Sequence, residues 1–335
     1  MRSNHLRRRE FIALLGGAAT TWPLAARAQQ PDRMRRIGAL ILYSENDQRS
    51  QRVVTAFQQG MEKVGWTVGR NLAIDYHWGI SDPERARVAT AELLRLAPDL
   101  ILAHSVSAVR AAQQATRTIP IVFTAISEPV TQGFVASLAH PGGNITGFTN
   151  LEPSLGGKWL ELLKEIAPNV THVAFMFNPA SSPVTPQFYR SVEAAAPKFA
   201  VETVMAPVHE PAEIEAVLTR LGREPGGGLI LPPDTFFSFH YKLIAELTAR
   251  HRLPSINPFG DYAAAGGLLA YGPNIPDEFR RAAEYVDRIF RAEKPGDLPV
   301  QQPIKFELVI NLKIAKALGL NAPQTLLVAA DEVIE

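Results

Sequence analysis

The chain has 335 residues, no cysteine and a formal net charge of +1, with 34 basic and 33 acidic side chains. Without cysteine it can form no disulfide, no thiolate metal site and no lipid-modified cysteine. Lysine and arginine are scattered among the acids rather than gathered into a basic stripe, which argues against nucleic acid as a partner.

The N-terminus has the pattern of an export signal. Arg8 and Arg9 precede a short apolar stretch over residues 11–19, and Ala26 and Ala28 supply the small residues of a cleavage site. The paired arginines favour the twin-arginine route. The alternative is an ordinary N-terminal helix or a membrane anchor, but the apolar run is shorter than the ~20 residues that span a bilayer. We therefore expect residues 1–28 to be removed near Ala28.

The expected mature protein is periplasmic and not embedded in the membrane. Removal of residues 1–28 takes away five arginines and one glutamate, which changes the net charge from +1 to about −3. The remaining length is too great for one typical domain and suits two.

In the first half, short apolar runs alternate with longer amphipathic segments. This alternation predicts a parallel sheet covered by helices on both faces. Strands are expected over 37–43, 72–78, 99–103 and 119–124, and helices over 49–64, 83–95 and 108–116. These elements make one doubly wound α/β lobe.

The same alternation restarts after Thr149 and predicts a second lobe of the same architecture. It runs through a helix over 156–166, a strand over 172–177, a helix over 186–198, and further elements over 201–206, 213–221, 228–231, 239–251, 255–257 and 268–271. A long helix over 277–292 follows, with apolar residues at a period of 3.6.

Ligands of open parallel sheets bind outside the carboxyl ends of the strands, so the loops after the predicted strands hold the candidate ligand-binding residues. These are Ser44, Ser105, Ser107, Ser127 and Glu128 in the first half, and Asn178, Ala180, Asp234, Phe236, Asp261 and Tyr271 in the second. Hydroxyls and backbone N–H groups suit a carboxylate, Glu128 or Asp234 suits an ammonium group, and Phe236 suits an apolar portion.

Ordinary helix capping is the alternative explanation for such loop residues. Ser107, Asp82 and Asp277 each stand just before or at the start of an expected helix, where side chains of this kind accept N–H hydrogen bonds.

Catalytic signals are weak. No nucleophile elbow, zinc-protease motif, P-loop or dinucleotide-binding glycine motif follows any expected strand. The eight histidines fall singly, and His104 stands out only because it ends a strand at the expected cleft. We expect no catalytic residue, no metal and no cofactor. An exported hydrolase or oxidoreductase on a doubly wound fold remains an alternative, and so does a ligand-sensing module of a membrane receptor.

Several stretches resemble a known family. They are Pro-Gly-Gly-Asn-Ile-Thr-Gly at 141–147, Asp-Leu-Pro-Val-Gln-Gln-Pro at 297–303, Phe-Glu-Leu-Val-Ile-Asn-Leu-Lys at 306–313 and Ala-Asp-Glu-Val-Ile-Glu at 330–335. Over about 35–335 the chain resembles the ABC-transporter substrate-binding proteins, which include tryptophan-type binding proteins.

The resemblance implies a type I periplasmic-binding-protein fold, with two lobes joined by three crossovers. It places residues 35–149 and 273–301 in the first lobe and 150–272 and 302–335 in the second, with a turn at 142–144 leading out of the first lobe and a helix over 308–318 on the second. It also implies a monomer that is not an enzyme. Such a protein captures a small organic ligand, amino-acid-like or carboxylate-bearing, by hinge closure and delivers it to an ABC permease in the inner membrane.

Overall fold

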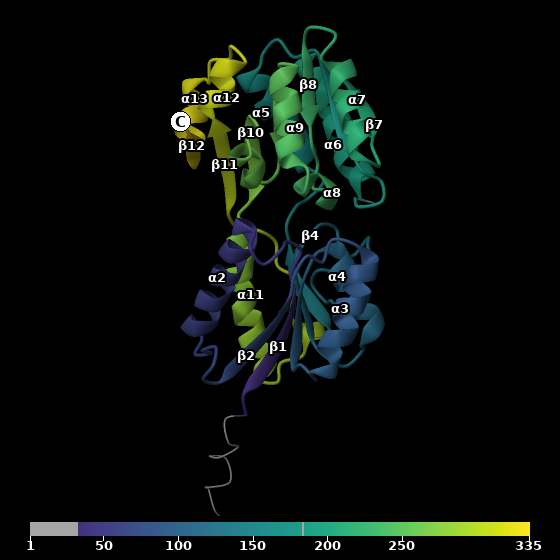
Figure 1. The fold of residues 1–335 in the computed structure, drawn as a ribbon, viewed down its shortest axis with the longest axis vertical. Helices are drawn as coiled ribbons and strands as arrows, with labels where there is room; N and C mark the ends of the chain where they lie inside the picture. Colours follow the sequence, from purple (N-terminus) through teal and green to yellow (C-terminus); the bar gives the residue numbers. More distant parts are fainter. Residues whose placement is uncertain (1–32, 183) are drawn as a thin grey trace, which may run out of the picture. The chain divides into compact units, whose positions relative to one another are not determined.

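The computed structural model describes residues 33–182 and 184–335. Residues Arg35–Glu335 form one compact unit, in which the chain builds two β-sheets (Figure 1). We call the part of the chain around the first sheet the first lobe and the part around the second sheet the second lobe. The expected signal segment, residues 1–28, lies outside the described residues.

The first sheet has five parallel strands in the order β2-β1-β3-β4-β5. They are β1 (Arg35–Leu40), β2 (Leu72–His77), β3 (Leu100–His104), β4 (Ile121–Ile126) and β5 (Ile145–Thr149). The first four confirm the expected strands, but the sequence analysis predicts no strand at β5. Gly142 and Gly143 do form a turn with positive φ angles of 71° and 64°, and the chain then adds one more strand before it leaves the lobe.

Helices cover both faces of the first sheet, as Figure 1 shows. On one face, α2 (Gln48–Lys63) packs against α11 (Ile275–Phe290), and Phe57 and Phe279 are fully buried in their shared core. On the other face lie α3 (Pro83–Arg95) and α4 (Val106–Ala115). The helix α11 therefore returns from the second lobe to complete the first.

Polar side chains fix where these helices begin. The predicted cap Asp82 is confirmed, since its carboxylate accepts hydrogen bonds from the backbone N–H groups at the start of α3. The other two expected caps are wrong. Ser105 rather than Ser107 caps α4, and Asn274 rather than Asp277 caps α11.

The second sheet has seven strands in the order β12-β11-β10-β9-β8-β6-β7. They are β6 (His172–Phe177), β7 (Glu202–Pro207), β8 (Gly227–Ile230), β9 (Ser255–Asn257), β10 (Leu269–Pro273), β11 (Phe306–Asn311) and β12 (Glu332–Ile334). All neighbours run parallel except β10 and β11, which are antiparallel.

The prediction of a helix over 308–318 is wrong for the first part of that range. Residues 306–311 form β11, and the helix begins only at Leu312. An apolar run this short fits a strand or a buried helix equally well, and the distant pairing with β10 decides between them.

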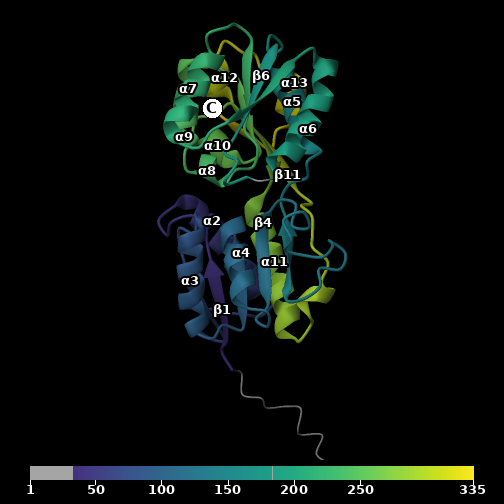
Figure 2. The ribbon, with the colours of Figure 1, turned by 90° about the vertical axis from the view of Figure 1, so that its right-hand side faces the viewer.

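Helices also cover both faces of the second sheet (Figure 2). One face carries α5 (Leu155–Ile166), α6 (Thr185–Ala195), α12 (Leu312–Ala317) and α13 (Gln324–Ala329), and the other carries α7 (Pro211–Leu221), α8 (Thr235–Ser238), α9 (Tyr241–Arg250) and α10 (Gly260–Ala264). The helix expected over 239–251 begins at Tyr241, and the separate short helix α8 precedes it.

The chain passes between the lobes three times. The passages lie between β5 and α5, between β10 and α11, and between the short helix η3 (Pro295–Asp297) and β11. The first and third run side by side, since the Thr149 N–H donates to the carbonyl of Gln301 at 2.8 Å. Within the described part of the chain, no helix combines the length and the apolar character that crossing a membrane requires.

Candidate functional site

A cavity of about 100 Å³ lies between the two lobes, where the carboxyl ends of both sheets face each other. The first lobe lines it with residues at or after the carboxyl ends of β1, β3, β4 and β5 and with the first two turns of α2 and the first turn of α11. They are Leu42, Tyr43, Arg49, Arg52, Val53, His104, Ser105, Val106, Ala125, Ser127, Gln132, Asn150, Ile275 and Pro276. The second lobe adds Ser181, Ser182, Val184, Pro233, Asp234, Thr235, Ser238, Phe259 and Asp261.

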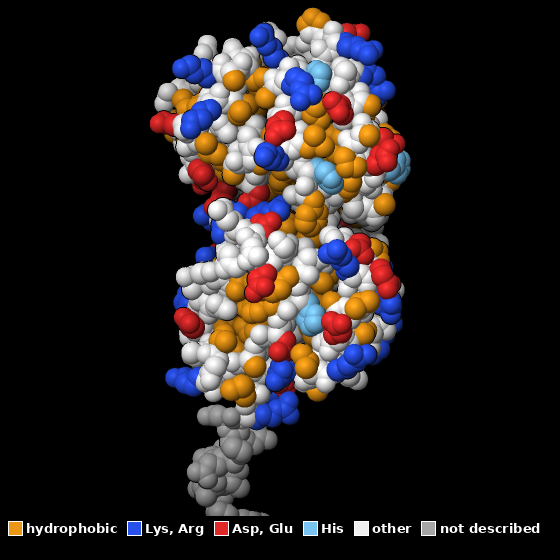
Figure 3. All heavy atoms as spheres, in the orientation of Figure 1, with side chains coloured by type: hydrophobic (Ala, Val, Ile, Leu, Met, Phe, Trp, Pro, Cys, Tyr) orange, Lys and Arg blue, Asp and Glu red, His pale blue; other side chains and the backbone are white. Residues whose placement is uncertain are grey.

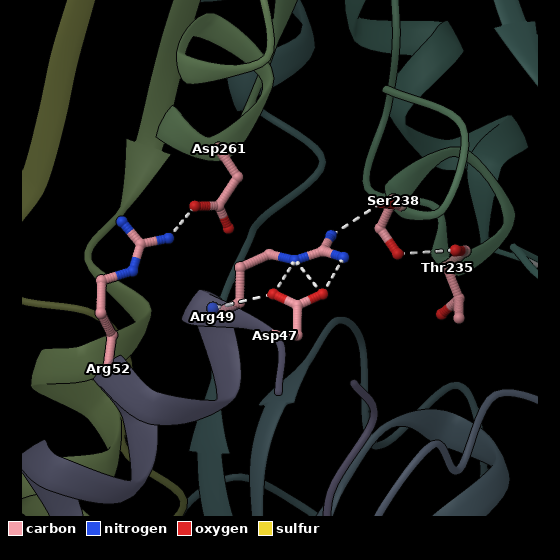
Figure 4. Close-up of polar contacts among 6 residues, drawn as sticks. All are labelled: Asp47, Arg49, Arg52, Thr235, Ser238 and Asp261. Carbon is pink, nitrogen blue, oxygen red and sulfur yellow. Dashed lines mark hydrogen bonds and ion pairs between the residues drawn. The ribbon is translucent and has the colours of Figure 1, made fainter. Parts of the chain in front are cut away.

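Arg49 reaches across the cavity from the first turn of α2 (Figure 4). Its Nη2 donates to Asp47 at 2.6 Å and its Nε donates to both oxygens of the same carboxylate, while its Nη1 donates to the Ser238 carbonyl of the second lobe at 2.7 Å. The guanidinium carbon lies 3.8 Å from the ring centroid of Tyr43. Burial is the largest single influence and lowers the pKa of Arg49, but the hydrogen bond to Asp47 and the electrostatic contributions of Tyr43, Asp47 and Asp261 together outweigh burial, so the pKa of Arg49 stays above its usual value.

A second arginine joins the lobes at the rim of the cavity. Arg52, one turn along α2, forms an ion pair with Asp261 of α10 (Figure 4). The Arg52 side chain is 56% exposed and that of Asp261 is 24% exposed. Solvent therefore reaches this pair, and its attraction is weaker than that of a buried pair.

Aromatic rings and a neutral histidine form one wall. Burial raises the pKa of Tyr43 to about 12, so its hydroxyl stays protonated. Burial, with a smaller contribution from the charge of Arg49, lowers the pKa of His104 to about 3. Both side chains are therefore uncharged at neutral pH, and the cations that line the cavity in the described part of the chain are Arg49 and Arg52.

Asp234 closes the cavity on the side of the second lobe, and both of its carboxylate oxygens already accept hydrogen bonds. One accepts from the Ser181 hydroxyl and from the Phe236 N–H at 2.9 Å, and the other accepts from the Asn178 N–H at 2.7 Å. Burial outweighs these bonds and raises the pKa of Asp234 to about 6. The side chain ties the loop after β6 to the loop after β8.

A chain of hydrogen bonds forms the wall on the side of the first lobe. The Ser127 hydroxyl donates to the Asn150 amide oxygen at 2.8 Å, and the Asn150 amide nitrogen donates to the Ala125 carbonyl at 3.2 Å. Gln132 donates from its amide nitrogen to the Ser127 carbonyl at 2.7 Å. These bonds fix the backbone at the ends of β4 and β5.

The expected ligand-binding residues fall into separate groups. Ser105, Ser127, Asp234 and Asp261 line the interlobe cavity. Ser107, Asn178, Ala180 and Phe236 line a neighbouring groove of about 870 Å³, which shares Val106, Ser181 and Thr235 with the cavity. Glu128 lines a third hollow, beside Gln302.

Two expected residues line none of these spaces. Ser44 lies in the turn after β1, where its carbonyl accepts the Asp47 N–H at 3.1 Å. Tyr271 lies within β10, and its ring stacks on that of Phe306 with 6.0 Å between centroids.

Arg49 and Arg52 are not among the residues predicted from the sequence, because those residues were sought only in the loops after strands. The sequence nevertheless marks both residues as unusual, since both arginines fall in the first turns of the expected helix over 49–64. The N-terminal end of a helix dipole disfavours cations, so two arginines there indicate a use other than helix stability. Among the described residues, no three histidine, aspartate or glutamate side chains are grouped so that they would hold a metal ion.

Comparison with known families gives one match over nearly the whole described chain. A model described as ABC transporter substrate binding protein matches residues 39–334. A curated relative, the tyrosine-binding protein of Clostridioides difficile strain R20291, is 26% identical over 267 residues, which are 79% of this chain and 76% of the relative.

Two solved structures show the same fold. One is the ABC domain from Streptococcus pneumonia in complex with L-Trp, at 23% identity and a TM-score of 0.81 over 90% of this chain and 99% of that one. The other is the ligand-free, open structure of a substrate-binding protein with adhesive properties from Clostridium difficile, at 25% identity and a TM-score of 0.69 over 90% and 99%. The expected type I periplasmic-binding-protein fold is confirmed.

Proposed function

The chain belongs to the ABC transporter substrate-binding protein family, and on that premise we propose that it is the solute receptor of an ABC importer for an amino-acid-like ligand. The family consists of substrate-binding proteins and not of enzymes, which removes the alternative of an exported hydrolase or oxidoreductase. In the proposal, the two lobes close on the ligand and the closed form delivers it to permease subunits in the inner membrane.

The observation that carries the proposal is the partly buried Arg49 in a cavity between two lobes. Asp47 and the Ser238 carbonyl use three of the five N–H donors of the guanidinium. The remaining donors are strong partners for a carboxylate, because charge-assisted hydrogen bonds are short and are weakly screened there. Ser105 and Ser127 add hydroxyl groups nearby. The helix α4 begins at Val106, so the positive end of its dipole also lies at the cavity. These groups favour a ligand that carries a carboxylate.

The ammonium group of such a ligand would bind Asp261. Of the two acids named for this role in the sequence analysis, Asp234 has both oxygens engaged and Glu128 lines a different hollow. Asp261 pairs with the largely exposed Arg52, whose side chain can move into solvent at little cost. A ligand ammonium can therefore replace Arg52 on this carboxylate.

The walls of the cavity favour an aromatic or apolar portion. Tyr43, His104 and Phe259 line it with rings, and Val53 and Val184 add aliphatic contact. The relatives described as binding tyrosine and as complexed with L-Trp support the same class of ligand.

Export completes the proposal. We assign residues 1–28 as a signal peptide of the twin-arginine type and the periplasm as the place of action, with the mature protein a monomer. Substrate-binding proteins of ABC transporters act outside the cytoplasm, and the paired Arg8 and Arg9 agree with that location.

A thermal-shift screen of the purified protein against amino acids and aromatic carboxylic acids tests the ligand class. A ligand at about 100 times its Kd stabilises the native state by about 2.7 kcal/mol, because it binds only that state. We expect amino acids with aromatic side chains to raise the melting temperature and simple amines to leave it unchanged. A screen in which no amino acid or carboxylate shifts the protein would contradict the proposal.

Isothermal titration of the best ligand then tests Arg49. Replacing Arg49→Met should weaken binding by about 1.5–3 kcal/mol, the contribution of a charged hydrogen bond. Arg288→Met is the matched control, because Arg288 also pairs with a carboxylate, that of Glu293, but does not line the cavity. Equal affinities of the two variants would show that Arg49 does not contribute to ligand binding.

A further inference from the structure

His104 is the last residue of β3, lines the cavity and is only 3% exposed. Its Nδ1 atom has no hydrogen-bond partner among the described residues. A buried polar atom without a partner costs about 1–3 kcal/mol. The Nδ1 atom is therefore a buried polar atom without a partner in the described part of the chain, on a side chain that lines the cavity.

Two aromatic rings hold the imidazole where it is. Tyr43 contacts it in a T-shaped arrangement with 5.7 Å between centroids, and Phe279 does the same from α11 at 5.1 Å. Such edge-to-face contacts are favourable, and turning the imidazole away from the cavity would break both. The ring is thus fixed beside the space that the ligand would occupy.

The charge state of His104 limits what it can bind. Because burial keeps the pKa of His104 far below neutrality, the imidazole is neutral and offers one N–H donor and one lone-pair acceptor. A neutral imidazole matches a hydroxyl or a ring N–H. A second cationic group in the ligand would be repelled by the positive charge of Arg49, which lines the same cavity.

Thr124 is the matched comparison within the chain. It lies beside His104 in register on the neighbouring strand β4, and its hydroxyl is also buried without a partner. Unlike His104, it does not line the cavity. A change at Thr124 therefore perturbs the same buried region without touching the ligand.

From these observations we infer that His104 is a specificity-determining residue, whose imidazole hydrogen-bonds an uncharged polar group on the ligand's side chain. The inference rests on the proposed function and deepens it. Among aromatic amino acids, the receptor would then bind those with a phenol hydroxyl or a ring N–H more tightly than those with an unsubstituted ring.

The test compares L-tyrosine with L-phenylalanine, which differ by one hydroxyl, by isothermal titration of the full chain and its variants. The unsubstituted protein should bind tyrosine at least about tenfold more tightly, since one satisfied buried hydrogen bond is worth about 1.4 kcal/mol. His104→Leu should bind the two within about twofold of each other. His104→Gln should keep part of the preference, and Thr124→Val should keep all of it.

The melting temperatures of the ligand-free variants give a second readout that needs no ligand. His104→Leu removes a buried polar atom without a partner, which stabilises, and two edge-to-face ring contacts, which destabilises, so its melting temperature should stay close to that of the unsubstituted protein. A marked drop in its melting temperature would show a structural partner for the imidazole and overturn the inference.

The outcomes separate the two claims. Equal affinity of the unsubstituted protein for tyrosine and phenylalanine, or an unchanged preference in His104→Leu, overturns the role of His104 and leaves the receptor function standing. Failure of every amino acid and carboxylate to bind overturns the proposed function, and the inference with it.

Discussion

Glu278 is a buried acid at the start of α11, just after the chain returns from the second lobe. One of its carboxyl oxygens accepts the Ala125 N–H at 3.0 Å, and the other has no hydrogen-bond partner among the described residues. Burial raises its pKa well above the usual value for a glutamate. The bond matters because Ala125 lines the cavity and has a positive φ of 59°, a conformation that alanine seldom adopts.

Replacing Glu278→Gln should flatten part of the pH dependence of stability. A raised folded-state pKa means that the carboxyl contributes its full stability below the pKa of the unfolded chain and loses it as pH rises through the higher folded-state value. The glutamine cannot ionise, so the variant should gain stability relative to the unsubstituted protein as the pH rises above the unfolded-state glutamate pKa of about 4.3. Urea unfolding midpoints at several pH values measure this gain.

The control for this prediction is Glu293→Gln. Glu293 is exposed, and its hydrogen bonds from Arg288 lower its pKa, which is the opposite direction. Glu293→Gln should therefore show no gain in stability over the unsubstituted protein at high pH. If Glu278→Gln followed the unsubstituted protein at every pH, the carboxyl would not be held protonated by burial.

At the scale of elements, the close crossing of α2 and α11 joins the two parts of the first lobe. Gly60 lies at that crossing, where a Cβ atom would stand 2.5 Å from the Arg280 carbonyl oxygen and 2.8 Å from the Ala283 Cβ. The first of these neighbours is backbone and cannot move without shifting α11. Because α2 carries Arg49 and Arg52 to the cavity, this crossing also positions the site.

Gly60→Ala should therefore destabilise the protein. Alanine gains about 1 kcal/mol over glycine in a helix, but overpacking costs about 1–3 kcal/mol, and here backbone must give way. Gly157→Ala in α5 is the matched control, since its nearest contacts would lie at 3.4 Å. Urea unfolding should show a lower midpoint for Gly60→Ala and an unchanged or higher one for Gly157→Ala. A stabilised Gly60→Ala would mean that the two helices are not in close contact.

Most of the elements were predictable from periodicity, because buried parallel strands and amphipathic helices differ in length and pattern. The prediction failed where distant pairing decides, as at β11, whose partner β10 lies on the far side of α11 in sequence. The candidate site was predictable only in part. Ser105, Ser127, Asp234 and Asp261 follow strands, as the rule for open sheets requires. Arg49 belongs to a helix, and its place at the cavity depends on a contact with the Ser238 carbonyl of the second lobe that no local pattern encodes.

At the scale of the whole described unit, few contacts join the lobes across the cavity. Arg49 donates to the Ser238 carbonyl, Arg52 pairs with Asp261, and Tyr43 meets Phe239 edge-on at 6.0 Å. Figure 3 shows charged side chains of both signs where the lobes meet. Contacts this sparse favour lobes that separate and close readily, which ligand entry requires.

Arg52→Ala should loosen the ligand-free protein without unfolding it. The loss of an exposed ion pair costs less than about 1 kcal/mol, but this pair is one of the few polar contacts between the lobes. Because the chain has no cysteine, spin labels at Glu62→Cys on α2 and Glu246→Cys on α9 would report the distance between lobes alone. We expect a broader distance distribution for Arg52→Ala.

Arg250→Ala serves as the control for this measurement, since it removes a similarly exposed pair, with Glu215, that lies within the second lobe. It should leave the distance distribution as it was. Identical broadening in both variants would show that the Arg52 pair has no part in holding the lobes together.

The central claim is that one small amino-acid-like molecule is held between the lobes by groups from both. A crystal structure of the protein with the best ligand of the thermal-shift screen tests it most directly. We expect the ligand in the cavity, with its carboxylate within hydrogen-bond distance of Arg49 in the first lobe and its ammonium at Asp261 in the second. A ligand bound to one lobe alone, or outside the cavity, would contradict the account.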